Sequence, residues 1–264
     1  MDCLRMHECE LCEKSFICEL DKHIHNAWLK KTRLGMIRKA IVVTSNKGGC
    51  GLTLFSLLLA AKIKQKGYKT ALIETSMSAY LPYYMGFDGT EGLDIVPGGI
   101  VPPTSQFGYP YLSPLLFMGN SSKPLFWDKE AMLKFIKKML INTNWGDVDI
   151  LLLDMPLCQI DMIKDLMSYM GDKLSQSVLL LDEKSRDSAP AKAYTSFLKE
   201  HTSLLKIVSS PSKIQGKVSE KKTTLPFVDS VCNSDIALSE VPSMVIEAYD
   251  NPLEEVSKVC LSIF

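Results

Sequence analysis

The apolar positions of this chain form two kinds of run that alternate from about residue 38 onward. Short runs rich in Val, Ile and Leu, typical of buried strands, span residues 39–44, 69–74, 148–154, 176–182, 204–209 and 226–229. Longer stretches predict helices over residues 53–66, 79–85, 128–141, 159–171, 187–200 and 252–263. Strands that alternate with helices predict an α/β fold with a doubly wound, mostly parallel sheet.

Three segments do not follow this alternation. Residues 86–122 are rich in Gly, Pro and Ser, and their prolines exclude a long helix, so we expect only short extended pieces around 93–96 and 111–118. Residues 210–224 are polar and predict a loop. Residues 19–33 have helical spacing and predict a tether helix that joins the N-terminus to the first strand.

The N-terminus is rich in cysteine. Four of the eight cysteines, Cys3, Cys9, Cys12 and Cys18, lie within its first 18 residues. Clustered thiols in a reducing compartment indicate metal or redox chemistry rather than disulfides. The sequence therefore predicts a Cys-rich arm with its tether over residues 1–37 and an α/β domain over residues 38–264.

Charge and composition exclude several classes of protein. Lys+Arg and Asp+Glu both number 30, so the formal net charge is zero and no basic excess favours nucleic acid. No apolar run is long enough to span a membrane, and no secretory leader is visible. We expect a cytoplasmic protein that binds neither nucleic acid nor membrane.

A glycine-rich stretch between the first predicted strand and helix indicates an anion site. Residues 44–53 read TSNKGGCGLT. Glycines allow a tight turn whose amides, with the N-terminus of the next helix, favour phosphate. Compared with the pattern G-x-x-x-x-G-K-[ST], Asn46 replaces the first glycine and Leu52 replaces the lysine, while Gly51 and Thr53 are in place.

Two motifs resemble one family. The run Lys47-Gly48-Gly49-x-Gly51-x-Thr53 resembles the K-G-G-x-G-K-[ST] loop of the MinD/ParA/Mrp group. The block from Asn144 to Pro156 is similar to W-G-x-[LV]-D-[YF]-L-[LV]-[IV]-D-x-P-P-G of the Mrp-type ATP-dependent iron–sulfur carriers and scaffolds. The resemblance spans most of residues 38–255 and implies a P-loop NTPase fold, ATP with Mg²⁺ and a dimer.

The resemblance also implies roles for individual residues. The nucleotide phosphates would lie against Lys47, Gly48, Gly49, Cys50, Gly51, Leu52 and Thr53. Thr53 would hold Mg²⁺, which Asp154 would support, and Lys47 would reach the nucleotide of the dimer partner. Lys47 and Asp154 are thus the candidate catalytic residues.

Three departures from the family pattern predict a degenerate ATP site. Leu52 carries no charge for the phosphates, and Ser76 stands where the family has the hydrolytic aspartate. Leu157 and Cys158 replace the second proline and the glycine of D-x-P-P-G. Charge stabilisation supplies most of phosphoryl-transfer catalysis, so we expect weak nucleotide binding and poor hydrolysis.

The N-terminal cysteines leave more than one ligand open. Cys9-x2-Cys12-x5-Cys18 resembles the cluster motif of the eukaryotic and archaeal scaffold branch, and a [4Fe–4S] cluster would take Cys3 as its fourth ligand. Zinc held by Cys9, Cys12, His23 and His25, or by thiolates alone, is the rival, as are unliganded thiols. Taken alone, His23 and His25 are expected on the surface of the tether helix.

The other cysteines carry less information. The family's C-P-x-C pair would fall near residues 210–224, which contain no cysteine, so we do not expect a dimer-bridging transferable cluster. Cys232 and Cys260 are isolated and expected to pack in the interior. Cys50 and Cys158 map to the nucleotide site, as small apolar residues or as a redox-sensitive pair.

These observations leave three functional hypotheses. The first is an iron–sulfur carrier or assembly factor with a degenerate ATP site, a homodimer or a heterodimer with an active paralogue, that serves apo iron–sulfur clients. The second is a slow but genuine ATPase of the same family, in which Lys47 replaces the missing charge. The third is a MinD/ParA-like module that positions a partner, although Leu253–Phe264 lacks the basic face of a membrane helix.

Overall fold

The centre of the protein is a parallel sheet. The computed structural model describes residues 5–76, 80–86, 93–118, 128–156, 160–210, 223–226 and 253–262. Within these ranges seven strands pair in the order β5-β2-β6-β1-β7-β8-β9, and every pairing is parallel. The strands are β1 (Ile37–Ser45), β2 (Thr70–Glu74), β5 (Tyr111–Leu112), β6 (Val148–Asp154), β7 (Leu174–Asp182), β8 (Ser203–Ser210) and β9 (Thr223–Pro226). The predicted doubly wound α/β fold is confirmed.

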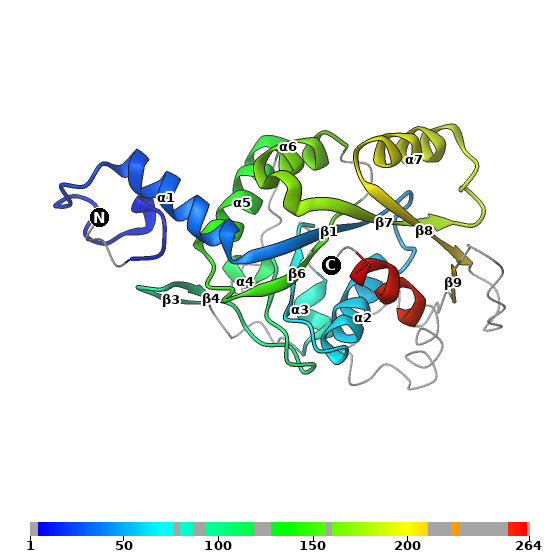
Figure 1. Cartoon of the computed structure of the whole chain (residues 1–264), viewed down its shortest axis with the longest axis horizontal. Coiled ribbons are helices and arrows are strands. Elements are labelled where there is room, and N and C mark those ends of the chain that lie inside the picture. The colour runs from blue at the N-terminus through cyan, green and yellow to red at the C-terminus, as the bar shows by residue number, and fades with distance from the viewer. Residues whose placement is uncertain are drawn as a thin grey trace.

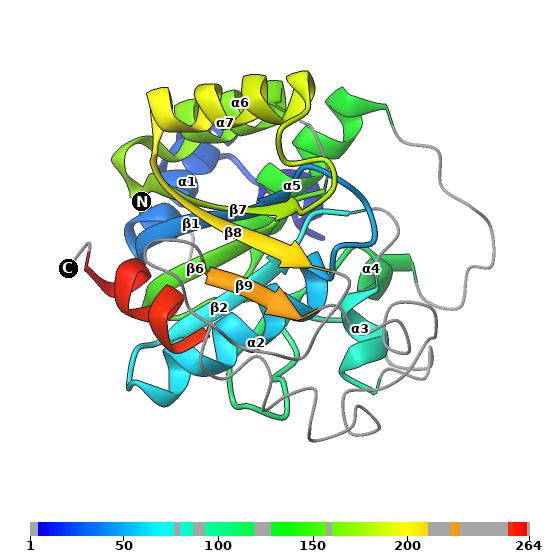
Figure 2. The same ribbon diagram turned by 90° about the vertical axis from the view of Figure 1, so that its right-hand side faces the viewer.

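Helices cover both faces of the sheet. They are α1 (Lys22–Gly35), α2 (Leu52–Gln65), α3 (Leu81–Tyr84), α4 (Leu115–Met118), α5 (Lys129–Asn142), α6 (Ile160–Met170), α7 (Ala189–His201), the 3₁₀ turns η1 (Cys9–Leu11) and η2 (Gly171–Lys173), and a C-terminal helix over residues 253–261. Figure 2 shows α5, α6 and α7 on one face, with α2 and the C-terminal helix on the other. The central strands β1 and β6 are buried along most of their length, as parallel strands covered on both faces must be.

The structure corrects two predicted elements. Residues 111–118 were expected to be extended, but only Tyr111–Leu112 is a strand and Leu115–Met118 forms α4. The Ser113 hydroxyl accepts a hydrogen bond from the Leu115 amide at 3.4 Å and so favours a helical turn there. The last strand spans Thr223–Pro226, three residues earlier than predicted. Residues 227–229 and most of the predicted loop 210–224 lie outside the described residues.

The N-terminal segment packs against the α/β domain through a buried arginine. Arg33, near the end of α1, is only 2% exposed. Its guanidinium donates to the Met6 carbonyl at 2.8 Å, to the Gly98 carbonyl and to Asn144 Oδ1 at 3.2 Å. One side chain therefore joins the N-terminal segment, α1 and two loops of the domain. The division of the chain at residue 37 stays a prediction.

Further hydrogen bonds hold the same segment in place. The Met6 amide donates to the Pro97 carbonyl at 2.8 Å. The Glu8 amide donates to Asn142 Oδ1 at 2.6 Å, and Asn142 Nδ2 donates back to the Glu8 carboxylate at 2.9 Å. Figure 1 shows the segment and α1 at one end of the molecule, beside the hairpin of β3 (Asp94–Val96) and β4 (Gly99–Val101).

Gly99 is the position most sensitive to an added side chain at this junction. Its φ is 103°, and a Cβ there would lie 2.5 Å from the Asn142 carbonyl oxygen and 2.9 Å from the Met6 carbonyl oxygen. We expect Gly99→Ala to lower the free energy of unfolding by about 2 kcal/mol or more, because it adds a backbone clash to a left-handed strain. Urea unfolding measures this loss. Gly98→Ala is the matched control, since its Cβ would meet no atom closer than 3.8 Å; equal losses in both variants would contradict the assignment.

Candidate functional site

The predicted phosphate-binding loop lies between the carboxyl end of β1 and α2. Gly49 and Gly51 have φ angles of 73° and 78°, in the left-handed region that favours glycine. Gly51 is the N-cap of α2, and among the described residues no side chain caps this helix. The amides of its first turn therefore remain available as donors for an anion.

Asn46, which replaces the first glycine of the motif, joins this loop by hydrogen bonds to the loop that follows β7. Its Oδ1 accepts from the Asp182 amide at 2.8 Å, and its Nδ2 donates to the Ser185 hydroxyl at 3.0 Å. A glycine could make neither bond. Sequence reasoning missed this role because the partners lie about 140 residues away.

Lys47 lies at the rim of the loop in an ion pair within its own chain. Its Nζ is 3.7 Å from Asp182 Oδ2, and its side chain is 57% exposed. The Asp182 carboxylate also accepts from the amide and hydroxyl of Ser185, at 3.1 and 2.9 Å. A pair this exposed contributes less than about 1 kcal/mol, so Lys47 can be released at small cost.

Two buried carboxyl groups lie side by side at the same edge of the sheet. Glu74 ends β2 and Asp154 ends β6, and they are register partners. Glu74 accepts from the Ser113 hydroxyl at 2.7 Å and from the amides of Tyr80 and Leu81 at 2.8 and 3.2 Å. Burial, and then the negative charge of Asp154, raise the pKa of Glu74 to about 8.

Asp154 faces the start of α2. Burial raises its pKa to about 7, against the opposing effect of the Thr53 and Ser56 hydroxyls. Its Oδ2 is buried and has no hydrogen-bond partner among the described residues. An unpaired buried oxygen beside the Thr53 hydroxyl is a suitable place for a divalent cation, so these two residues fit the predicted magnesium site.

The remaining predicted residues of this site are placed less fully. Leu52 is the first residue of α2 and is partly buried against the core. Ser76 follows β2 closely at the same edge. Cys50 is 6% exposed, and its Sγ donates to the Lys47 carbonyl at 3.1 Å. Leu157 and Cys158 lie outside the described residues, so the redox-pair hypothesis stays untested.

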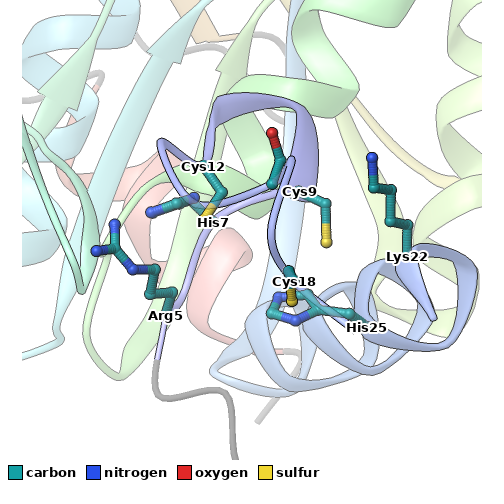
Figure 3. Close-up of a pocket in the computed structure, with 8 residues that line it drawn as sticks. Arg5, His7, Cys9, Cys12, Cys18, Lys22 and His25 are labelled. Carbon is teal, nitrogen blue, oxygen red and sulfur yellow. The ribbon is translucent and has the colours of Figure 1, made fainter. Parts of the chain in front are cut away.

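The N-terminal cysteines meet in a pocket at the other end of the molecule. Figure 3 shows this pocket between the N-terminal segment and α1. It is lined by Arg5, His7, Cys9, Cys12, Ser15, Cys18, Lys22 and His25. Cys3 and Cys232 lie outside the described residues, and Cys260 is buried in the C-terminal helix as predicted. Three of the four predicted cluster ligands therefore line one space.

The two histidines of the tether helix differ in environment. His23 is exposed, as expected, and does not line the pocket, so it does not join Cys9 and Cys12 as the zinc alternative required. His25 is 2% exposed, so its predicted surface position is wrong. In the described part of the chain, no three His, Cys, Asp or Glu side chains converge closely enough to hold one metal ion without rearrangement.

Comparisons with known proteins identify relatives of both the sequence and the fold. Residues 36–230 match a model of the ParA family described as "NUBPL iron-transfer P-loop NTPase". The chain is 28% identical over 152 residues to an "Iron-sulfur cluster carrier protein" of Methanococcus maripaludis, covering 56% of this chain and 52% of the relative. It is 26% identical over 125 residues to a "Cytosolic Fe-S cluster assembly factor Nubp2 homolog" of Drosophila simulans, and this match covers 47% of this chain and 48% of the relative. The matches thus span about half the length of these relatives.

Solved structures support the fold alone. A nucleotide-binding protein of Archaeoglobus fulgidus in complex with ADP has a TM-score of 0.63 and 19% identity, covering 86% of this chain and 94% of that one. The cell division ATPase MinD of Pyrococcus furiosus has a TM-score of 0.51 and 16% identity, and the match covers 84% of this chain and 99% of that one. None of the helices described for this chain is long and apolar enough to cross a bilayer.

The buried carboxyl pair predicts a pH-dependent stability. A carboxyl group with a raised pKa binds more protons folded than unfolded, so stability falls as pH rises from about 4.5 towards 8. We expect Glu74→Gln to make this decline shallower by more than about 1 kcal/mol between pH 5.5 and 8.5. Urea unfolding at both pH values measures it, with Glu200→Gln on the exposed face of α7 as the control. If the free energy of unfolding falls equally between the two pH values in wild type and Glu74→Gln, Glu74 does not cause the pH dependence.

Proposed function

This chain belongs to the ParA family of P-loop NTPases, and from that premise we propose that it is an iron–sulfur cluster carrier or assembly factor with a degenerate ATP site. The observation that carries the proposal is the pocket in which Cys9, Cys12 and Cys18 come together beside a P-loop domain. Soft thiolate donors suit iron–sulfur clusters, and their spacing resembles the cluster motif of the scaffold branch.

The residues of the pocket suit a negatively charged metal group. Arg5 and Lys22 line it with the cysteines, and their positive charges would attract a metal group that carries net negative charge. An iron–sulfur cluster bound there would be the cargo that the protein passes to apo client proteins. The names of the curated relatives, a cluster carrier and a cytosolic assembly factor, support this role and a cytoplasmic location.

The nucleotide site fits ATP and Mg²⁺ in shape better than in charge. The loop backbone and the first turn of α2 would hold the phosphates, while Thr53 and Asp154 would hold Mg²⁺, which screens phosphate charge when bound. Leu52 supplies no cation, and a charge-assisted hydrogen bond is worth about 1.5–3 kcal/mol. We therefore infer weak nucleotide binding and little hydrolysis.

A dimer would bring Lys47 to a second nucleotide site. We propose a homodimer or a heterodimer with an active paralogue, in which Lys47 leaves Asp182 and reaches across the interface. The exposure of the lysine and its long 3.7 Å ion pair support this movement. The same feature favours the second candidate function, a slow ATPase in which the partner's Lys47 replaces the missing charge.

The third candidate, a positioning module, receives less support. Membrane-binding members of such a class need a free amphipathic helix. Here three apolar side chains of the C-terminal helix are buried against the domain, with Leu253 4%, Val256 1% and Cys260 0% exposed, although Val259 is 41% exposed. Glu254 of this helix also pairs with Lys66 of the α2 C-cap at 2.7 Å.

Restoring the missing lysine tests the degenerate nucleotide site. We expect Leu52→Lys to tighten binding of Mg²⁺ and a non-hydrolysable ATP analogue by about 10- to 100-fold, because it returns one charge-assisted hydrogen bond to the phosphates. Isothermal titration calorimetry measures the dissociation constant. Leu52→Met is the control for side-chain size. If the two variants bind alike, the loop does not contact phosphate as proposed.

Anaerobic metal analysis tests the carrier function. We expect the isolated full chain to contain iron and acid-labile sulfide, or to take them up on reconstitution, and Cys12→Ser to lose most of both. Cys50→Ser, which removes a thiol outside the pocket, should keep them. A wild-type protein without iron after oxygen-free reconstitution would overturn the proposal.

Phosphate release compared between wild type and Lys47→Ala decides the slow-ATPase alternative, which predicts a measurable rate only in the wild type.

A further inference from the structure

His25 is a buried imidazole that the family motif does not explain. It is 2% exposed, and its Nε2 is buried without a hydrogen-bond partner among the described residues. Leaving a buried polar atom unpaired destabilises the folded protein, because the atom loses its hydrogen bonds to water and gains none in return. The ring lines the same pocket as three cysteines, so a ligand in that pocket would remove the cost (Figure 3).

The position of His25 is fixed relative to the cysteine loop. The adjacent residue Asn26 accepts a hydrogen bond from the Cys9 amide at 3.1 Å and donates to the Glu10 carboxylate at 3.3 Å. Asp21 caps the first turn of α1 by accepting from the His23 and Ile24 amides at 2.8 and 3.1 Å. Helix α1 therefore presents His25 to the η1 turn in a defined register.

The three thiols are brought to His25 by the turns of the same loop. The Cys12 amide donates to the Cys9 carbonyl at 3.1 Å, and the Ser15 amide donates to the Cys12 carbonyl at 3.0 Å. The chain then returns so that Cys18 lines the pocket next to α1. The thiols of Cys12 and Cys18 are free. Three soft sulfur donors and the imidazoles of His7 and His25 thus surround one space. The Nδ1 of His7 lies 3.2 Å from the Glu8 carbonyl oxygen, whereas the Nε2 of His25 has no hydrogen-bond partner among the described residues.

We propose that His25, through Nε2, is the fourth ligand of the metal group in this pocket, together with Cys9, Cys12 and Cys18. Four donors complete an iron–sulfur or tetrahedral site without Cys3. The side chains do not yet converge on one point, and we infer that metal binding closes the loop onto α1, since metal sites are rarely preformed without their ion. That the group is an iron–sulfur cluster rests on the proposed function; the ligand set does not.

An imidazole ligand would change the chemistry of the cluster. Replacing one thiolate by a neutral nitrogen removes one negative charge and raises the reduction potential, as it does in clusters with histidine ligands. It also leaves a nitrogen nucleus bonded to iron, which pulsed EPR of the reduced cluster detects. This signal identifies a ligand independently of how much cluster the protein holds.

The experiment uses the full chain reconstituted with iron and sulfide under anaerobic conditions. We expect wild type, Cys3→Ser and His23→Ala to hold equal iron and sulfide and to show the nitrogen coupling. His23 is the matched control because it lies on the same helix outside the pocket. His25→Ala should lose most of the iron, and His25→Cys should regain it without nitrogen coupling and at a more negative potential. This rescue separates ligation from a loss of folding.

The outcomes distinguish the two proposals. If Cys3→Ser loses the cluster while His25→Ala keeps it, or if wild type shows no nitrogen coupling, the assignment of His25 is overturned and the carrier function stands. If wild type takes up no iron but binds zinc at one equivalent, and His25→Ala loses that zinc, the ligand set stands and the carrier function falls. A chain that binds neither metal overturns both.

Discussion

The buried guanidinium of Arg33 is the interaction on which the arrangement of the two candidate sites depends. Desolvation lowers the pKa of this group and makes its burial costly, so its charge must be compensated by hydrogen bonds. The compensating acceptors come from Met6, Gly98 and Asn144, which belong to three segments far apart in the sequence. Because these bonds dock the N-terminal segment, the cysteine pocket is part of a folded structure rather than of a free arm.

The predicted phosphate-binding loop keeps the backbone shape of its motif although Leu52 stands where the motif has a lysine. In this chain the side chain of Asn46 holds the loop in place, by hydrogen bonds with the Asp182 amide and the Ser185 hydroxyl. Burial meanwhile raises the pKa of both Glu74 and Asp154. Protonation of these carboxyl groups lowers the electrostatic cost that a lysine or a metal ion would otherwise offset.

The sequence predicts what depends on local pattern and misses what depends on distant contacts. The central strands and the glycine-rich loop are local features, and their predicted positions agree closely with the structure, whereas the predictions for residues 111–118 and for the last strand were less accurate. The roles of Asn46 and Arg33 are not local, because their partners lie about 140 and up to about 110 residues away. His25 was misplaced for a related reason: helical spacing alone cannot show that the cysteine loop folds over that side of α1.

Strand β1 connects the two sites and also separates them. It begins two residues after α1 ends, and its carboxyl end leads into the phosphate-binding loop. Nine residues at about 3.3 Å each make this buried strand roughly 30 Å long, and the cysteine pocket lies beyond its amino end, against α1 (Figure 1). The residues that line the cysteine pocket, and those whose hydrogen bonds hold the N-terminal segment in place, are distinct from the residues of the predicted phosphate-binding loop. A substitution in this loop therefore leaves the contacts around the cysteines unchanged, so the sequence at one end of the strand can vary independently of the thiols at the other.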